Sequence, residues 1–293
     1  MKKIHILLTL CVLFWSGNFI VGRYINESID PLQLSLFRWL GVALILSPLL
    51  IKDFANIFKV LRHNFVILNI LAILSVTGFN TFLYFALQTT TATNALLINS
   101  IVPIEILILS FFILKIKIAF KQFIGIVLSM LGMMFLVIKG DISILQTMEF
   151  NIGDFWVLVA GLVWAFYSVL VKFKPKELSG LSFLVTITYI GLFWIFMIYL
   201  FNGYSLSNDI VLVQKYYLVF GYISIFASVL SYIFWNMGVQ KLGANQTGQF
   251  THLMPLFGSI LAYIFLGEVL HLYHFIGAVV IMIGIYLSLF KKQ

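Results

Sequence analysis

The sequence predicts an all-α integral membrane protein with ten transmembrane helices, arranged as two five-helix repeats of inverted topology. Three observations lead to this fold class: the composition, the length of the apolar segments and an internal repeat. Hydrophobic residues make up 62% of the 293 residues and charged residues only 10%, and the mean hydropathy is +1.09. Soluble domains carry about 25% charged residues. The composition therefore predicts that most of the chain lies in lipid.

The apolar segments are long enough to cross a bilayer, and polar turns separate them. Between His63 and Lys115 the only charged residue is Glu105, and one helix of that length would span two bilayers at about 1.5 Å per residue. The segment must therefore fold back, at the polar run 88–94. The same argument places ten helices at 4–22, 33–52, 65–87, 94–114, 120–138, 155–172, 181–201, 217–238, 244–266 and 272–290. The first resembles a secretory signal but has no small-x-small cleavage site, so we expect it to be retained.

The net charge of +8 reflects the orientation of the chain in the membrane. With both ends in the cytoplasm, fourteen of the eighteen Lys and Arg fall on the inner side, as the positive-inside rule requires. These residues are interpreted as topology determinants and contacts to lipid headgroups. No basic face remains for nucleic acid, which we exclude as a partner.

An internal repeat divides the chain into two halves. An offset of 152 residues pairs Gln88 with Gln240, Pro103 with Pro255, Gly132 with Gly284, and the motif Phe-Ile-Gly at 123–125 with 275–277. An offset of 149 pairs Trp15 with Trp164. We predict repeats at 1–138 and 154–293, joined by a linker at 139–153.

Five helices per repeat place the second repeat in the membrane upside down relative to the first. The basic positions Lys115, Lys117 and Lys121 become Gly267, Val269 and Tyr273 in the second copy, as expected if this loop faces the opposite side. Inverted repeats of this kind are typical of transporters whose substrate site lies between the halves near the midplane of the membrane.

Four segments resemble the EamA group of the drug/metabolite transporter superfamily: WSGNFIVGR at 15–23, TATNALLINSIVP at 91–103, VWAFYS at 163–168 and HLMPLFGSILAYIFLGE at 252–268. The resemblance implies an inner-membrane carrier of small metabolites with a cavity formed by helices 1, 3, 4, 6, 8 and 9. It also implies that helices 5 and 10 are peripheral. The family's Leu-Gly-Glu is present at 266–268, but its first-half counterpart is Leu-Lys-Ile. We therefore interpret Glu268 as a structural cap.

Motifs for ATP-driven or hydrolytic chemistry are missing from the sequence. It contains no GxxxxGK[ST], HExxH or GxSxG, so we expect no cofactor, no bound metal and transport along a gradient. His271 and His274 have i, i+3 spacing but are interpreted as interfacial residues.

Glu105 lies about 16 Å deep in the fourth predicted helix at about 1.5 Å per residue, close to the membrane centre. A charge there costs at least about 2.5 kcal/mol, which leaves three interpretations. The carboxyl group couples transport to protons or another cation or recognises an amine on the substrate; it forms an ion pair with Arg38; or it is a neutral acid bonded between helices. Pro103, two residues earlier, and Pro255 in the second repeat are expected to kink their helices.

Other polar and aromatic side chains in the apolar helices are candidate site residues. For the amides, hydrogen bonding between helices and substrate binding both remain open; they are Asn18, Asn80, Asn99 and Asn236. The aromatic candidates are Trp15, Trp164, Tyr167, Tyr232 and Trp235, since such faces bind amphipathic or cationic groups, although each could be packing alone.

The ninth predicted helix carries a polar stripe at 100° per residue, which we expect to face the cavity; it consists of Asn245, Gln249, His252, Ser259 and Tyr263. His252 is interpreted either as a proton relay or as a histidine bonded to a neighbouring helix. Glu105 is equivalent to Phe257, which lies off this stripe, so strict symmetry would direct Glu105 towards a neighbouring helix.

The sequence thus predicts a secondary or facilitative transporter for a small polar or amphipathic metabolite, working by alternating access. Amino acids and related compounds are the leading substrates, and export is slightly favoured over uptake. The expected partners are the metabolite, lipids and protons; the oligomeric state is not predicted. Two alternatives remain. One is a lipid-flipping or scaffold protein, favoured only by the outer base Arg23. The other is an intramembrane enzyme, which would need a convergent set such as paired acids or a Ser-His dyad at one depth, whereas Glu105 is the one acid found at the midplane.

Overall fold

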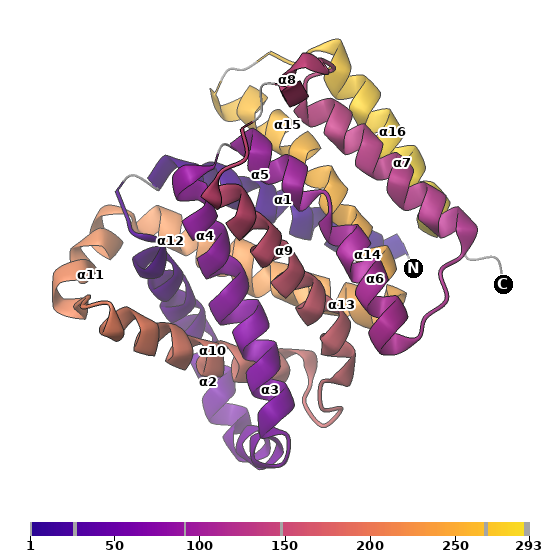
Figure 1. Cartoon of the computed structure of the whole chain (residues 1–293). Coiled ribbons are helices and arrows are strands. Elements are labelled where there is room, and N and C mark those ends of the chain that lie inside the picture. The colour runs from indigo at the N-terminus through magenta and orange to yellow at the C-terminus, as the bar shows by residue number, and fades with distance from the viewer. Residues whose placement is uncertain (1, 26–27, 91, 147–148, 267–268, 290–293) are drawn as a thin grey trace.

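The computed structural model describes residues 2–25, 28–90, 92–146, 149–266 and 269–289. Over these ranges every regular element is helical (Figure 1), and nine segments are long and apolar enough to cross a membrane. They match nine of the ten predicted spans. The remaining span, the ninth predicted helix at 244–266, is also helical but consists of three consecutive helical segments. The all-helical membrane fold class is therefore confirmed, whereas the count of ten is not.

The elements follow the predicted segments closely. The first repeat contains α1 (Lys2–Ile25), α2 (Pro31–His63), α3 (Phe65–Ala72), η1 (Ile73–Phe79), α4 (Asn80–Thr89), α5 (Ala92–Asn99), α6 (Val102–Leu114) and α7 (Phe120–Val137). The second contains α9 (Ile152–Leu170), η2 (Val171–Phe173), α10 (Gly180–Phe201), α12 (Tyr217–Ser224), η3 (Ile225–Leu230), α13 (Ser231–Leu242), α14 (Ala244–Gly248), η4 (Gln249–Leu253), α15 (Met254–Leu266) and α16 (Leu272–Leu289). Two short helices lie in loops: α8 (Ser143–Gln146) and α11 (Leu206–Lys215).

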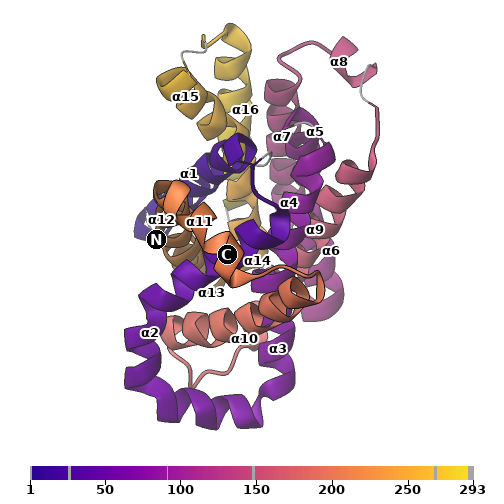
Figure 2. The same ribbon diagram turned by 90° about the vertical axis from the view of Figure 1, so that its left-hand side faces the viewer.

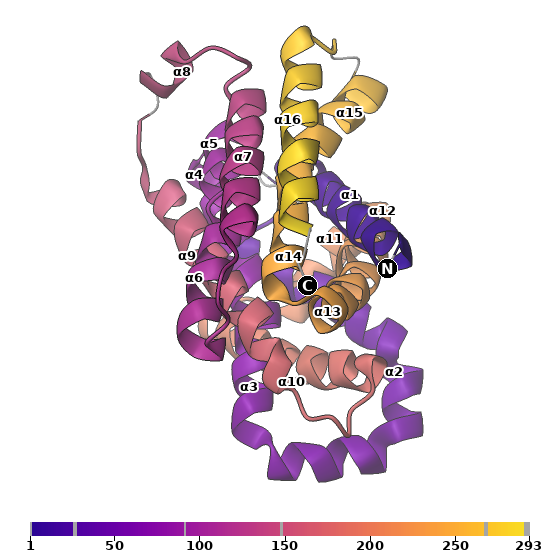
Figure 3. The same cartoon turned by 90° about the vertical axis from the view of Figure 1, so that its right-hand side faces the viewer.

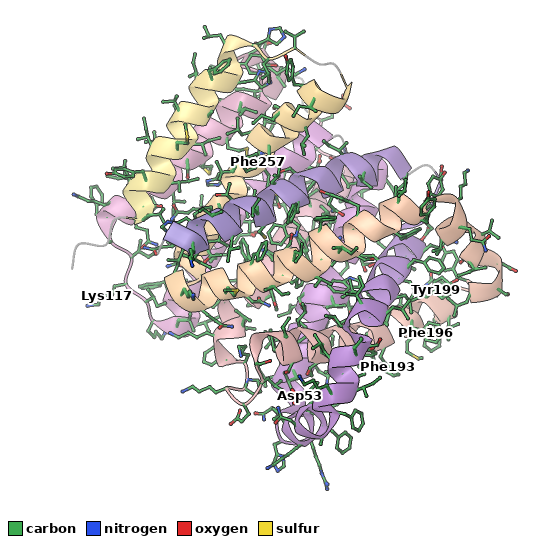
Figure 4. The ribbon with its side chains drawn as sticks, turned by 180° about the vertical axis from the view of Figure 1, so that it is seen from behind. Asp53, Lys117, Phe193, Phe196, Tyr199 and Phe257 are labelled. Carbon is green, nitrogen blue, oxygen red and sulfur yellow. The ribbon has the colours of Figure 1, made fainter. Side chains whose placement is uncertain are left out.

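Helix α2 extends beyond its predicted end at 52. Asp30 caps its start by accepting a hydrogen bond from Leu32 N, and Pro31 occupies the first turn, a position that suits proline because the missing N–H needs no partner there. Asp53 has non-helical backbone angles, φ −110° and ψ 15°, and the chain bends there (Figure 4). Figures 2 and 3 show α2 and α3 enclosing α10, which contacts both.

The first helix of each repeat packs against the other repeat. Helix α1 contacts α13 and α15, whereas α9 contacts α4 and α6. These are equivalent arrangements, because α9, α13 and α15 correspond to α1, α4 and α6. The first, third and fourth spans of the two halves therefore meet in one interface, and the second spans, α2 and α10, also pack against each other.

Helices α7 and α16 are the fifth spans of the two repeats. They pack against each other in antiparallel directions and lie side by side in Figures 1 and 3. A Cβ atom on Gly125 would lie 2.5 Å from the carbonyl oxygen of Gly284, and one on Gly277 would lie 3.1 Å from that of Gly132. The 152-residue offset converts the first contact into the second. Glycine is required because the backbones approach too closely for a side chain.

A π-helical segment occurs at the equivalent position of both repeats, η1 in the third span and η3 in the eighth. Such wide turns release backbone carbonyl groups from regular helix bonding and are frequent at functional sites. The carbonyl oxygen of Ser75 in η1 accepts a hydrogen bond from Tyr232 Oη at 2.7 Å, and that of Ala227 in η3 accepts one from Trp15 Nε1 at 3.0 Å. Ser75 and Ala227 are repeat equivalents, so each carbonyl group binds a side chain of the opposite repeat.

Candidate functional site

A cluster of buried aromatic side chains lies where the two repeats meet. The rings of Trp15 and Trp164 are repeat equivalents and lie edge to face, 5.2 Å apart. Trp235 packs on both, at 5.1 and 5.4 Å, and Tyr167 and Tyr232 complete the cluster around Trp164 at 5.1 and 5.5 Å. The structure thus brings together the five aromatic residues that the sequence singled out.

Further repeat-equivalent pairs contact each other directly. Asn80 Nδ2 donates to Tyr232 Oη at 3.2 Å, and His252 Nε2 lies 3.1 Å from the carbonyl oxygen of Ser100. Both pairs are separated by 152 residues in the chain. Equivalent residues can touch only where they lie near their symmetry axis, so the pseudo-two-fold axis runs through this part of the molecule.

A small cavity lies beside these pairs. Its volume is about 20 Å³, room for about one water molecule. Six of the predicted candidates line it, namely Trp15, Asn18, Arg38, Asn80, Asn99 and Trp164, together with Phe19, Phe79, Leu83, Val102, Thr251 and Met254. We call it the central pocket. It is too small for a metabolite in this conformation, so binding one requires the surrounding side chains or helices to move.

Arg38 contributes the one formal charge among the lining residues of the central pocket. It is 1% exposed, and its guanidinium donates to Ser228 Oγ at 2.6 Å, Tyr84 Oη at 2.8 Å, the Ala227 carbonyl oxygen at 2.9 Å and Asn18 Oδ1 at 3.4 Å. These bonds connect α2 with α1, α4 and η3. An ion pair with Glu105 was one of three interpretations, and the structure does not show it: the hydrogen-bond partners of Arg38 are these neutral groups, and Glu105 Oε2 has none among the described residues.

Glu105 lies in the first turn of α6 and faces α9 rather than the central pocket. Its Oε2 is 3.1 Å from the position that a Cβ on Gly161 would take. This oxygen is buried and has no hydrogen-bond partner among the described residues. This agrees with the symmetry argument, which directs Glu105 towards a neighbouring helix. Figure 4 labels Phe257, the equivalent residue on α15.

The polar stripe predicted on the ninth span does not face one cavity. Thr251 and Met254 line the central pocket, whereas Gln249 and His252 are buried between helices. The prediction assumed about 100° per residue, but η4 is a 3-10 helix that turns about 120° per residue. Five such residues rotate the later side chains by about 100° relative to the expected face.

His252 is bound between helices on both sides. Its Nδ1 lies 2.7 Å from Ser129 Oγ of α7 and its Nε2 lies 3.1 Å from the Ser100 carbonyl oxygen. Gln249 Nε2 donates to the Asn245 carbonyl oxygen at 3.3 Å. This geometry supports the interpretation of His252 as a residue that joins helices.

The predicted kinks coincide with the two prolines. Helix α5 ends at Asn99, and α6 resumes at Val102 with Pro103 in its first turn. In the second repeat, η4 ends just before α15, in which Pro255 is the second residue. Glu268 lies outside the described residues, as does the side chain of Arg23.

A much larger cavity, which we call the vestibule, opens at one end of the molecule. Its volume is about 720 Å³. It lies between the loop joining α6 to α7, the end of α9 and the junction of α13 and α14, and its basic lining residues are Lys117, Lys172, Lys174, Lys176 and Lys241. Lys117 lies at the edge of the molecule in Figure 4. Ser168 also lines the vestibule and accepts a hydrogen bond from Trp235 Nε1 at 3.2 Å, so Trp235 connects the aromatic cluster with the vestibule wall.

A buried acid that the sequence analysis missed lies at the opposite end, where α9 begins. Asp154, 1% exposed at the start of α9, accepts hydrogen bonds from Thr90 Oγ1, from Asn94 Nδ2 at 3.3 Å and from Asn151 N at 2.9 Å. These bonds join the second repeat to the turn between α4 and α5. The motif NIGD at 151–154, a helix-capping signature, was the available signal.

A polytopic helical fold with a pseudo-two-fold axis, a small pocket on that axis and a lysine-lined vestibule at one end is typical of membrane transporters of the inverted-repeat class. The chain belongs to the EamA-like transporter family, whose sequence profile matches residues 2–138 and 151–290.

Several relatives share this family. An uncharacterized transporter of Bacillus subtilis strain 168, YyaM, is 28% identical over 97% of this chain and 92% of its own length. An uncharacterized transporter of Archaeoglobus fulgidus is 27% identical over 100% of this chain and 99% of its own. The WAT1-related chloroplastic protein At3g02690 of Arabidopsis thaliana is 25% identical over 95% of this chain and 67% of its own length. A solved crystal structure shares the fold, with a TM-score of 0.76, 13% identity and coverage of 98% of this chain and 96% of its own.

Proposed function

We propose that this protein is a secondary or facilitative transporter that moves a small polar or amphipathic metabolite across the cytoplasmic membrane by alternating access. The observation that carries the proposal is the position of the central pocket on the pseudo-two-fold axis, with a vestibule of about 720 Å³ leading towards it from one end. If the two equivalent halves exchanged their conformations, this vestibule would close and an equivalent one would open at the other end. Amino acids and related compounds remain the leading substrates.

The vestibule is assigned to the cytoplasmic side. Its five lysines match the basic side expected from the positive-inside rule, and this assignment places both chain ends in the cytoplasm. The conformation is then closed outside by the Asp154 hydrogen bonds and, at its centre, by the aromatic cluster. Transport requires Trp235 and its neighbours to move apart.

Labelling of introduced cysteines tests alternating access. Cys11, the one native cysteine, is first replaced by Ser. Val239→Cys then places a thiol in the vestibule, and Asn99→Cys places one in the central pocket. In membranes of known sidedness, an impermeant maleimide should label Val239→Cys from the cytoplasmic side. A substrate gradient should change the labelling of Asn99→Cys in opposite directions from the two sides. Equal, gradient-independent labelling of Asn99→Cys from both sides would indicate an open pore.

Coupling to protons is assigned to Glu105. A charged carboxylate with a buried, unpartnered oxygen is costly between helices, whereas a protonated carboxyl is much cheaper there. Glu105 also contacts the opposite repeat through Gly161, so a movement of α6 against α9 changes its surroundings. Protonation in one conformation and release in the other would link transport to a pH gradient.

Glu105→Gln separates this role from a structural one, because glutamine keeps the shape of a protonated carboxyl. In proteoliposomes it should permit exchange of substrate across the membrane but abolish accumulation driven by an imposed pH gradient. If accumulation persists at the wild-type level, another group carries the proton.

A further inference from the structure

Arg38 is a buried cation with neutral partners on the wall of the central pocket. A guanidinium removed from water loses hydration energy that hydrogen bonds to hydroxyl, amide and carbonyl oxygens restore only partly. Buried arginines normally bind carboxylate or phosphate groups, whose two oxygens match the planar fork. Among the described residues no carboxylate bonds to Arg38, and no acidic side chain lines the central pocket.

One of the Arg38 bonds is easily replaced. The bond from Nη1 to Asn18 Oδ1 is the longest of the four, at 3.4 Å, and the same oxygen also accepts from Tyr84 Oη at 3.2 Å. Asn18 lines the central pocket beside Arg38. A small outward movement of the Asn18 amide would expose Nη1 to a stronger acceptor that enters the pocket.

The vestibule, which leads towards the central pocket, carries positive charge, as Arg38 does. Five lysines line the vestibule, and no acid is among its described lining residues. Burial lowers the pKa of Lys174, and the negative charge of Glu177, which does not line the vestibule, opposes that shift. The remaining four lysines suffice to make the vestibule attractive to anions, since a cleft lined by one sign of charge concentrates the opposite ion.

We propose that the transported substrate carries a carboxylate group, that the Arg38 guanidinium binds it in place of Asn18, and that the vestibule lysines attract it. The inference rests on the proposed transport function and narrows its substrate class. Glu105 faces α9, so the central pocket offers a positive charge for an acid and no negative charge for an amine. Recognition therefore depends on the carboxylate, whether or not the rest of the molecule carries an amino group.

Ligand binding to the purified full-length protein in lipid nanodiscs tests this assignment without any gradient. The probes are sodium benzoate, sodium succinate and phenylalanine, each compared at constant ionic strength with its amide counterpart: benzamide, succinamide and phenylalaninamide. Thermal stabilisation is titrated for each. We expect at least one acid to stabilise the protein while its amide does not. Stabilisation by phenylalanine alone would assign an amino acid, and stabilisation by benzoate or succinate a simple organic acid. Amides that stabilise as well as the acids would overturn the proposal.

Arg38→Gln should weaken the binding of the stabilising acid by about 30-fold or more, the factor that corresponds to about 2 kcal/mol for an unpaired charge partner. Arg62→Gln is the matched control, because Arg62 lies on the same helix but is exposed and lines neither cavity. Size-exclusion profiles and ligand-free melting show whether each variant is folded. If Arg38→Gln does not fold, Arg38→Lys takes its place and should weaken binding at least about tenfold, because it loses the bidentate fork. Wild-type affinity in the folded variant would remove Arg38 from the site.

The vestibule is tested separately by association rates, followed through tryptophan fluorescence. Combining Lys117→Gln and Lys241→Gln should slow association several-fold and flatten its dependence on salt, whereas Lys59→Gln on exposed α2 surface should change neither. An unchanged rate would show that these lysines do not attract the ligand. Carboxylate binding that persists without any transport in proteoliposomes would refute the proposed function and leave this assignment standing.

Discussion

The contact between α7 and α16 gives the sharpest prediction about the fold. In Gly284→Ala the added Cβ would lie 2.4 Å from Ser129 N and 2.6 Å from the Gly125 carbonyl oxygen. Both are backbone atoms, so no side-chain rotation relieves the clash. An ordinary contact begins near 3.4 Å, and the two helices must therefore separate by about 1 Å.

The cost follows from the loss of dispersion contacts. A gap of about 0.5–1 Å forfeits about a quarter to a half of each contact energy along the separated interface, and in a membrane such contacts largely hold helices together. Overpacking of this kind costs about 1–3 kcal/mol. We expect Gly284→Ala at the upper end of that range. Gly277→Ala should cost less, because its nearest neighbour is the side-chain Cβ of Leu136 at 2.9 Å.

Reversible unfolding of the purified protein in mixed micelles measures these differences. Gly258→Ala is the control, since nothing beyond its chain neighbours and the adjacent backbone of its own helix lies within 4 Å of its added Cβ, and alanine in a helix is favoured over glycine by about 0.5–1 kcal/mol. The expected order of stability is Gly258→Ala, wild type, Gly277→Ala, Gly284→Ala. If Gly284→Ala is as stable as Gly258→Ala, the close antiparallel packing of these helices is refuted.

Three further predictions concern the ends and centre of the transport path. Asp154→Asn removes an acceptor of charge-assisted hydrogen bonds worth about 1.5–3 kcal/mol each. Maleimide labelling of Asn99→Cys from the outer side should therefore rise about tenfold or more. Unchanged labelling would show that Asp154 does not seal that end. Trp235→Ala should raise labelling of the same cysteine from the vestibule side, and a result equal to wild type would place the inner barrier elsewhere. Tyr232→Phe leaves the π-helical carbonyl of Ser75 with a weaker partner and should lower unfolding free energy by about 1–2 kcal/mol; full stability would mean that water or Asn80 replaces the hydroxyl.

Helix existence could be predicted from the sequence, but helix rotation could not. Glu105 is the exception: repeat symmetry predicts that it faces a neighbouring helix, because its equivalent Phe257 lies off the polar stripe. For the polar stripe, the sequence predicts the wrong face after Gln249, because the residue pattern does not indicate that five residues form a 3-10 helix. In the same way, the π-helical turns at Ser75 and Ala227 change which carbonyl groups are available without any break in hydrophobicity.

The role of Arg38 depended on contacts between distant segments. The sequence offered Glu105 as a partner because both lie near the same face of the membrane. The folded chain instead surrounds the guanidinium with Asn18, Tyr84 and Ser228 from three other helices. Tyr84 and Ser228 carried no signal, because a single hydroxyl group in an apolar helix is common.

The sequence by itself determined the solvent, the spans and the two-fold repeat, since the cost of charge in lipid and the length of a bilayer-crossing helix are properties of the chain alone. Only the tertiary structure decided which side chains share the pocket, where the vestibule lies and which buried charge has only neutral partners among the described residues. Those properties depend on the rotation and packing of helices, where a local change in turn angle moves a side chain from one neighbour to another at little cost in hydrophobic energy.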